Sequence, residues 1–272
     1  MQFLVEEYIK LQISDLNTIK RATCQFVVDE FDYKSVGSGV FIKIKNSHFL
    51  VSAAHVMDKL GEIAVPISNG KFLLKPGGNS IINNFGGSRE EDKLDIAILK
   101  LDEKSVEELS ESYAFIDECD ILLNHKFVNL PIYTFFGYPS SLSNTTFCKK
   151  KFQVYSFFHF STPGEKSLYE RFGLNDYQNV IASYDKKKSY SQKSKLFSNG
   201  PDLYGISGCG LWMSDPINIY KKQSNPKLVA IMTDWLLKDK RFVVGTRVDL
   251  ITEAIRTKFN VDTVKSEIVS YK

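Results

Sequence analysis

The sequence predicts an all-β fold, a sandwich or a barrel, and three observations support this. Much of the chain consists of short runs rich in Val, Ile, Phe and Tyr, at 23–28, 38–44, 48–53, 62–67, 95–101, 131–138, 151–160 and 228–235. Turn clusters such as NG, PGGN, GGS and YPSS divide these runs, as is typical of successive antiparallel strands. The helices of roughly ten residues or more that a parallel β-α-β fold places between its strands are missing.

Helical periodicity is limited to three stretches. Apolar residues recur every three or four positions from Phe3 to about Ile19, which predicts an amphipathic helix on the outside of the main domain. We expect a short helix around 105–112 and another over 249–258. The polar, basic stretch 186–195 is typical of a mobile loop.

Composition argues against several classes of protein. The 272 residues are 43% hydrophobic and 25% charged, which is ordinary for a globular protein, and the formal net charge is only +3. Lysine runs at 149–151 and 186–195 allow the alternative of a nucleic-acid patch. Such runs more often lie on solvated loops, so we expect no nucleic-acid partner.

Cysteine usage and the absence of a leader point to the cytoplasm. The four cysteines are widely spaced and form no CxxC pair, which argues against a zinc site and against a disulfide framework. The first residues lack the pattern of a signal peptide, and no run of about 18 apolar residues exists. We therefore predict a cytoplasmic protein with reduced thiols, no metal, no cofactor and no membrane partner.

Three residues have the sequence surroundings of a base, an orienting acid and a nucleophile. His55 follows the apolar run FLVSAA, Asp95 opens the apolar run DIAILKL, and Ser207 lies in GISGCG. Serine needs a neighbouring base to become a nucleophile, and a carboxylate fixes the histidine tautomer for that role. The glycines around Ser207 permit a strained turn in which the backbone N–H groups of Gly205 and Ser207 form an oxyanion hole.

Each of these residues also has a simpler interpretation. Ser207 alone fits an ordinary glycine-rich loop, and His55 alone fits a histidine at the edge of a core. Asp95 alone fits a loop cap, with Asp92 and Lys93 in water. A buried carboxylate needs a partner, however, and His55 supplies one, so the ordered set favours the catalytic interpretation.

Together, SGVFI…VSAAHV, DIAILKL and GISGCGLW resemble the trypsin/chymotrypsin-like serine peptidases, including their chain order His–Asp–Ser. KLVAIMTDW resembles the strand that lines the substrate cleft, and VVGTRVDLITEAI the closing strand and C-terminal helix. The resemblance implies a chymotrypsin-like fold of two six-stranded antiparallel β-barrels. It implies an N-terminal helix at 1–21, a first barrel at 22–120 with His55 and Asp95, and a second barrel at 121–272 with Ser207 and the C-terminal helix.

Two departures separate the chain from the secreted digestive members of that family. Val56 replaces the cysteine that follows the histidine, and Ile206 replaces the aspartate that precedes the serine. The resemblance therefore implies no activation cleavage. It is nearest to intracellular bacterial trypsin-like peptidases and to HtrA/Deg-type domains without a PDZ domain.

The resemblance also places the substrate cleft. Pro201 occupies the position at which trypsin carries its pocket aspartate, so a preference for Arg or Lys is not expected. Thr233 is expected to hydrogen-bond Asp95, and the backbone of Thr233, Asp234 and Trp235 to pair with substrate as a strand. Trp235 is expected to narrow the specificity pocket.

These expectations combine into one functional prediction with one alternative. We predict a serine endopeptidase that cleaves a protein or peptide substrate through an acyl-enzyme, with narrow specificity and control by a regulatory protein partner. Small peptidases of this kind resemble those of bacterial defence or stress systems. The alternative is a protease-fold module that binds peptides with little or no turnover.

Overall fold

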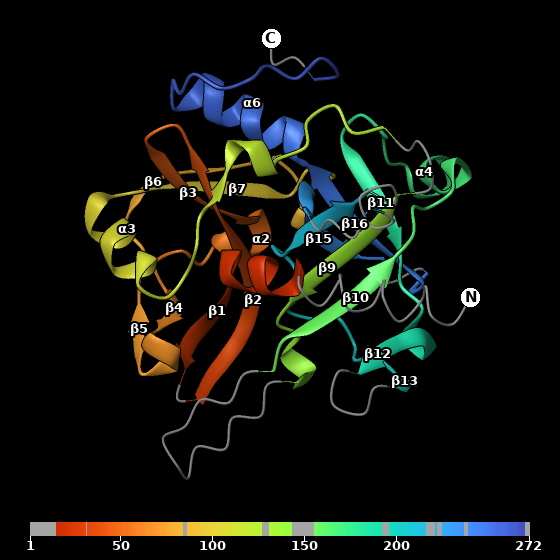
Figure 1. The fold of residues 1–272 in the computed structure, drawn as a ribbon, viewed down its shortest axis with the longest axis horizontal. Coiled ribbons are helices and arrows are strands. Elements are labelled where there is room, and N and C mark those ends of the chain that lie inside the picture. Colours follow the sequence, from red (N-terminus) through yellow and green to blue (C-terminus); the bar gives the residue numbers. More distant parts are fainter. Residues whose placement is uncertain are drawn as a thin grey trace.

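Two antiparallel β-sheets that curl into barrel-like halves form the body of the protein (Figure 1). The computed structural model describes residues 15–30, 32–83, 86–126, 131–142, 155–191, 196–215, 221, 225–236 and 239–269. The first sheet is drawn in red to yellow and the second in green to blue (Figure 1). The predicted all-β, double-barrel fold class is confirmed.

The first sheet follows the strand order β5-β4-β1-β2-β3-β7-β6, and β8 adds to β2 in parallel. This path has seven strands, one more than the six expected, and β4 and β5 pair as a hairpin at its edge. The strands are β1 Thr23–Glu30, β2 Asp32–Ile44, β3 Ser47–Ala53, β4 Ile63–Ile67, β5 Phe72–Leu74, β6 Gly78–Ile82, β7 Ile96–Leu101 and β8 Ile116–Asp117.

The second sheet follows the order β10-β9-β14-β15-β16-β11, and β12 and β13 form a separate hairpin. The strands are β9 Ile132–Gly137, β10 Phe157–Ser161, β11 Asn179–Ser183, β12 Ser189–Ser191, β13 Leu196–Ser198, β14 Gly210–Ser214, β15 Lys227–Trp235 and β16 Phe242–Arg247. The loop expected over 186–195 instead contains a 3₁₀ turn and β12, while 192–195 and the lysines at 149–151 lie outside the described residues.

Helices lie at the ends of the chain and between strands. Residues 15–22 are helical, in line with the predicted N-terminal helix, whose first part lies outside the described residues. Two further predictions are confirmed by α3 Glu103–Ser110 and α6 Val248–Lys258, whereas α2 Ala54–Met57 and α4 Lys166–Phe172 were not expected. The 3₁₀ turns are η1 Ser68–Gly70, η2 Arg89–Glu91, η3 Glu118–Asp120, η4 Ser140–Leu142 and η6 Lys186–Lys188.

Alternation along the strands directs apolar side chains into separate cores. On β2, Val40 and Ile42 face a core shared by the two sheets, while Phe41 faces the interior of the first barrel, as the two-residue period of a strand requires. A third core fills the second barrel. Ile251 and Ile255 of α6 belong to the shared core, so this helix covers the junction of the two sheets (Figure 1).

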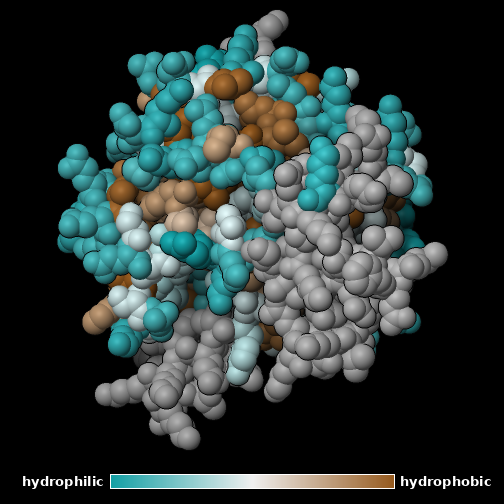
Figure 2. All heavy atoms as spheres, viewed as in Figure 1, coloured by the Kyte–Doolittle hydropathy of each residue, from teal (hydrophilic) through white to brown (hydrophobic). Residues whose placement is uncertain are grey.

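The described surface is largely hydrophilic on the face seen in Figure 2, with apolar side chains visible between polar ones. Within the described ranges, no helix has both the length and the hydropathy needed to cross a membrane.

Candidate active site

Strand register brings His55 and Asp95 together. β3 pairs with β7 antiparallel, and Ala53 at the end of β3 lies opposite Ile96 at the start of β7. The residues just beyond this pair therefore meet where the ends of these two neighbouring strands lie side by side. α2 begins directly after β3 and carries His55, and the Ala54 N–H donates to the Asp95 carbonyl oxygen over 2.9 Å.

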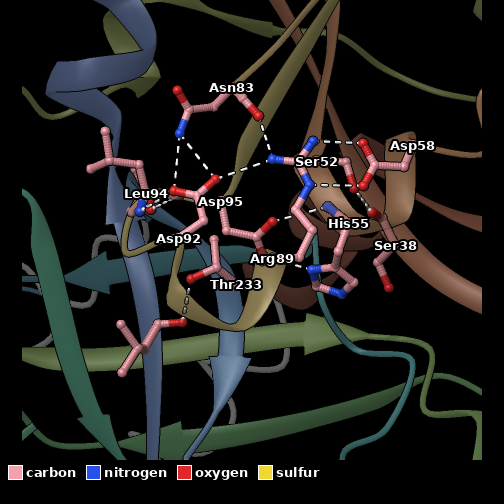
Figure 3. Close-up of polar contacts among 12 residues, drawn as sticks. Ser38, Ser52, His55, Asp58, Asn83, Arg89, Asp92, Leu94, Asp95 and Thr233 are labelled. Carbon is pink, nitrogen blue, oxygen red and sulfur yellow. Dashed lines mark hydrogen bonds and ion pairs between the residues drawn. The ribbon is translucent and has the colours of Figure 1, made fainter. Parts of the chain in front are cut away.

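The carboxylate of Asp95 holds His55 at two points. Its Oδ2 lies 2.6 Å from Nδ1 of the imidazole, and its Oδ1 accepts from the His55 backbone N–H over 2.9 Å (Figure 3). The Asp95 side chain is 9% exposed and the His55 side chain 39% exposed. An ionised carboxylate accepts only, so the hydrogen of a neutral imidazole lies on Nδ1 and Nε2 keeps its lone pair. This is the tautomer that a general base needs.

The backbone of Asp95 is held in an unusual conformation. Its φ of 38° lies in the left-handed region that residues other than glycine seldom adopt. The second sheet supports this segment, because the Asn179 side chain donates to the Lys93 carbonyl over 2.8 Å and the Thr246 hydroxyl donates to the Leu94 carbonyl. Strain of this kind persists only where surrounding contacts enforce it.

Ser207 lies in a tight turn that packs against the first sheet. The flanking Gly205 and Gly208 have φ values of 83° and 89°. The Ser207 carbonyl accepts from the Ser38 N–H over 2.8 Å, which joins the turn to β2. A Cβ on Gly208 would lie 1.9 Å from the Ser38 carbonyl oxygen and 2.1 Å from the Ser52 hydroxyl, so glycine is required there.

The turn that carries Ser207 and the segment that carries His55 meet at the junction of the two sheets. Gly208 touches Ser52, which precedes His55 by three residues on the same chain segment, so the turn and the base lie at the same junction of the two sheets. Within the described residues, Ser207 Oγ forms no hydrogen bond with His55 Nε2. Bonds of this type are often long in unliganded enzymes and shorten when substrate binds.

The backbone around Ser207 leaves two donors open. The N–H groups of Ile206, Gly208 and Cys209 donate to carbonyls of Leu203, Met232 and Ile206, respectively. Those of Gly205 and Ser207 have no acceptor in the part of the chain that the structure describes. The two open N–H groups are the pair expected to hold an oxyanion.

Thr233 does not make its expected contact. Its hydroxyl donates to the Val244 carbonyl oxygen over 3.4 Å, and no bond to Asp95 is present (Figure 3). The prediction of a Thr233–Asp95 hydrogen bond is therefore wrong. The pairing of β15 with β16 shifts register between Met232 and Asp234, and this bulge turns the Thr233 side chain toward β16.

β15 nevertheless runs beside the turn that carries Ser207. The Met232 carbonyl accepts from the Gly208 N–H over 2.6 Å, and the Met232 N–H donates to the Cys209 carbonyl over 2.8 Å. Asp234, two residues farther along, is exposed. Neighbouring protein removes water from its carboxyl and raises its pKa, the Asp95 charge raises it further, and the charges of His55 and Lys93 lower it. Asp234 therefore lies within electrostatic range of the candidate base.

Trp235 lies in a group of aromatic side chains. It is 6% exposed, and its ring packs edge-on against Tyr204 at 5.5 Å and Tyr184 at 6.3 Å between centroids. Its indole N–H donates to the Lys240 carbonyl over 2.9 Å. The half-buried Pro201 joins the same region, since its carbonyl accepts from the Tyr184 hydroxyl over 2.5 Å.

The remaining histidines are poorer bases. Burial lowers the pKa of His125 and of His159 to about 4. Burial is also the main cause that lowers the pKa of His48. Neither His48 nor His159 forms an ion pair with a carboxylate within the described residues, and His55 is the candidate base. The described residues also include no cluster of His, Cys, Asp and Glu that could hold a metal ion.

Sequence reasoning missed the residues that hold the Asp95 segment. Asp92, which only the loop-cap alternative for Asp95 placed in water, has a side chain 1% exposed and bonds to Arg89 and Asn83. Asn179 and Thr246 are fully buried in the second sheet. The one available signal was the run of polar residues 88–93 directly before an apolar strand, which a solvated loop explains equally well.

Comparison with protein-family models and with curated proteins finds no match to this chain.

Proposed function

We propose that the protein is a serine endopeptidase with Ser207 as nucleophile, His55 as general base and Asp95 as the acid that orients His55. The observation that carries the proposal is that Asp95 bonds to His55 at two points, over 2.6 Å and 2.9 Å, near the tight turn that carries Ser207. The resemblance of the three motifs to trypsin/chymotrypsin-like peptidases supports the same assignment.

The reaction follows from these positions. When a peptide binds, Ser207 Oγ comes within reach of His55 Nε2 and attacks the scissile carbonyl carbon while its proton passes to Nε2. The N–H groups of Gly205 and Ser207 stabilise the oxyanion of the tetrahedral intermediate. Asp95 stabilises the imidazolium, which gives the proton to the leaving amine. Water then attacks the acyl-enzyme by the same route, and the carboxylic acid product leaves.

We further propose that this activity is narrow in specificity and controlled by a protein partner in the bacterial cytoplasm. The packing of Trp235 against Tyr184 and Tyr204 supports a restricted pocket, and Pro201 supplies no charge for a basic side chain. The absence of a Ser207–His55 bond in the described chain supports a site completed by substrate or partner.

A fluorophosphonate probe tests the assignment directly. The wild type is expected to react at Ser207, as mass spectrometry of the labelled peptide would show, and S207A and H55A are expected not to react. T257A, which removes a helix hydroxyl on α6, serves as the matched control and is expected to label like the wild type. Equal labelling of wild type and S207A would contradict the proposal.

A second candidate function is peptide binding without turnover. Two observations favour it over a fully assembled enzyme: the Ser207 hydroxyl forms no hydrogen bond within the described residues, and the Trp235 ring is buried against Tyr184 and Tyr204. N-terminal profiling of a host lysate separates the two, because only a peptidase creates new termini that depend on Ser207. Capture of the same peptides by wild type and S207A without new termini would support the binding module.

A further inference from the structure

We propose that Arg89 is a positioning residue that fixes the helix of His55 relative to the segment of Asp95. The inference rests on the proposed function, since it concerns the alignment of the base with its orienting acid. Arg89 begins the short turn η2 between β6 and β7, and it touches neither His55 nor Asp95 through a hydrogen bond.

One edge of the guanidinium holds α2. Nε of Arg89 donates to Asp58 Oδ2 over 2.8 Å, and Nη2 donates to Asp58 Oδ1 over 2.6 Å, so the pair is bidentate (Figure 3). Asp58 caps the end of α2, where its N–H donates to the Ala54 carbonyl over 2.8 Å. Because α2 is only four residues long, a restraint on Asp58 is a restraint on His55.

The other edge holds the segment that leads to Asp95. Nη1 of Arg89 donates to the Asn83 carbonyl and, over 3.2 Å, to Asp92 Oδ2 (Figure 3). The nearly buried Asp92 carboxylate also accepts from the Asn83 amide over 2.9 and 3.0 Å and from the Leu94 N–H over 3.0 Å. Leu94 directly precedes Asp95, so one guanidinium spans both halves of the catalytic pair.

The proposed role of Arg89 is to align His55 with Asp95, which differs from the small contribution that a surface ion pair makes to stability. Exposed pairs contribute little to stability, and the side chains of Arg89 and Asp58 are 29% and 41% exposed. A displacement of about 1 Å between catalytic groups, in contrast, can lower a rate about 10²-fold. The left-handed φ of Asp95 makes that alignment depend on its supports.

The charges around His55 provide a second measurement, the midpoint of its imidazole titration, which a purely structural role of Arg89 would leave unchanged. The carboxylates that face His55 are Asp95, Asp58 and Asp234, and the nearby cations are Arg89 and Lys93. Replacing Arg89 by a neutral residue leaves Asp58 uncompensated, which favours the imidazolium of His55. Replacing Asp58 by Asn leaves the Arg89 charge uncompensated, which disfavours it.

The experiment compares wild type, R89M and D58N, with R241M as matched control. Arg241 also forms a bidentate pair, with Asp239 at 2.8 Å through each of two bonds, and has no hydrogen bond to the candidate site. Two quantities are measured in each protein: the rate of fluorophosphonate labelling, and the midpoint of the His55 imidazole titration from nitrogen-15 NMR. Thermal unfolding confirms that each variant is folded.

We expect labelling to fall about tenfold or more in R89M and in D58N. The His55 midpoint is expected to move to higher pH in R89M and to lower pH in D58N, with R241M like the wild type. If the midpoints and the labelling rates of R89M and D58N match those of the wild type, the positioning role is overturned. Should R89M fail to fold, D58N alone is decisive: slower labelling with a lower His55 midpoint supports the positioning role, and wild-type values of both overturn it. A wild type that does not label, combined with opposite shifts of the midpoint, would contradict the peptidase proposal and still support this role for Arg89.

Discussion

Gly208, in the turn that carries Ser207, packs so closely against Ser52 of β3 that a Cβ on Gly208 would lie 2.1 Å from the Ser52 hydroxyl. Ser52 Oγ itself donates to the Ser38 carbonyl over 2.7 Å, and the Ser38 N–H donates to the Ser207 carbonyl over 2.8 Å. This contact places the candidate nucleophile beside the strand that ends at the candidate base, so it joins the two halves of the site.

We predict that G208A is strongly destabilised. The added methyl would overlap both Ser38 and Ser52, and the φ of 89° disfavours alanine. Left-handed strain and overpacking together are expected to lower the free energy of unfolding by about 2–5 kcal/mol. Urea unfolding measures the change, with G61A as control because a Cβ on Gly61 meets nothing within 4 Å. Equal midpoints for the two variants would contradict this packing.

We predict that D95N loses most of its reactivity while its fold remains. The asparagine oxygen can still accept from the His55 backbone N–H, but an amide NH₂ facing Nδ1 selects the wrong imidazole tautomer. In related triads the same change lowers kcat by about 10⁴-fold. The rate of fluorophosphonate labelling measures the loss, and D262N, a change on an exposed residue, is the control. Wild-type labelling of D95N would remove Asp95 from the proposed triad.

We predict that D15N becomes more stable than the wild type as the pH rises. Burial raises the pKa of Asp15 from 3.8 to about 6, and the nearby Ser214 hydroxyl offsets only part of this. Between about pH 4 and pH 6 the native state holds a proton that the unfolded chain has lost, so the contribution of Asp15 to stability falls as the pH rises through this window.

The size of that effect follows from the shift. About two pKa units correspond to about 3 kcal/mol of stability that the wild type loses as the pH rises. D15N carries no such charge, so it is expected to be more stable than the wild type by part of this amount at pH 8 and by none of it at pH 3.5. The depressed pKa values of His125 and His159 act in the opposite direction, because each group favours folding less as the pH falls toward 4. The histidines contribute equally in both proteins, so the quantity to compare is the difference in free energy of unfolding between wild type and D15N, measured with urea at each pH. If the difference in free energy of unfolding stays constant from pH 3.5 to pH 8, the pKa of Asp15 is not raised in the native state.

The sequence identified the parts of the site that depend on local pattern. An apolar run ending in small residues placed His55 at a strand end, and an acid opening a buried strand marked Asp95. The register of Ala53 with Ile96 then brings the two together. The rest depends on tertiary structure. The Thr233 hydroxyl turns with a bulge that exists only where β15 meets β16. Asp92 bonds to Arg89, whose guanidinium also bonds to Asp58, 31 residues earlier in the chain.

The contact between Tyr204 and Trp235 leads to a last prediction, about access to the site. Tyr204 is 53% exposed, precedes Gly205, and packs edge-on against the buried indole at 5.5 Å. Removing its ring in Y204A takes away one wall of the packing around Trp235, while the backbone bond from the Ser140 N–H to the residue 204 carbonyl, 2.7 Å long, does not depend on the side chain. We therefore expect a folded variant with a more accessible indole.

Acrylamide quenching of tryptophan fluorescence measures that access, and only two tryptophans contribute to the signal. Trp212 is fully buried and serves as an internal reference. Y177A, which removes an equally exposed tyrosine ring that forms no ring contact in the described structure, is the control. If Trp235 restricts the pocket, Y204A should also react several-fold faster than the wild type with fluorophosphonates that carry a bulky side group, and equally with small ones. Quenching that rises without any change in the bulky-to-small ratio would place Trp235 outside the pocket.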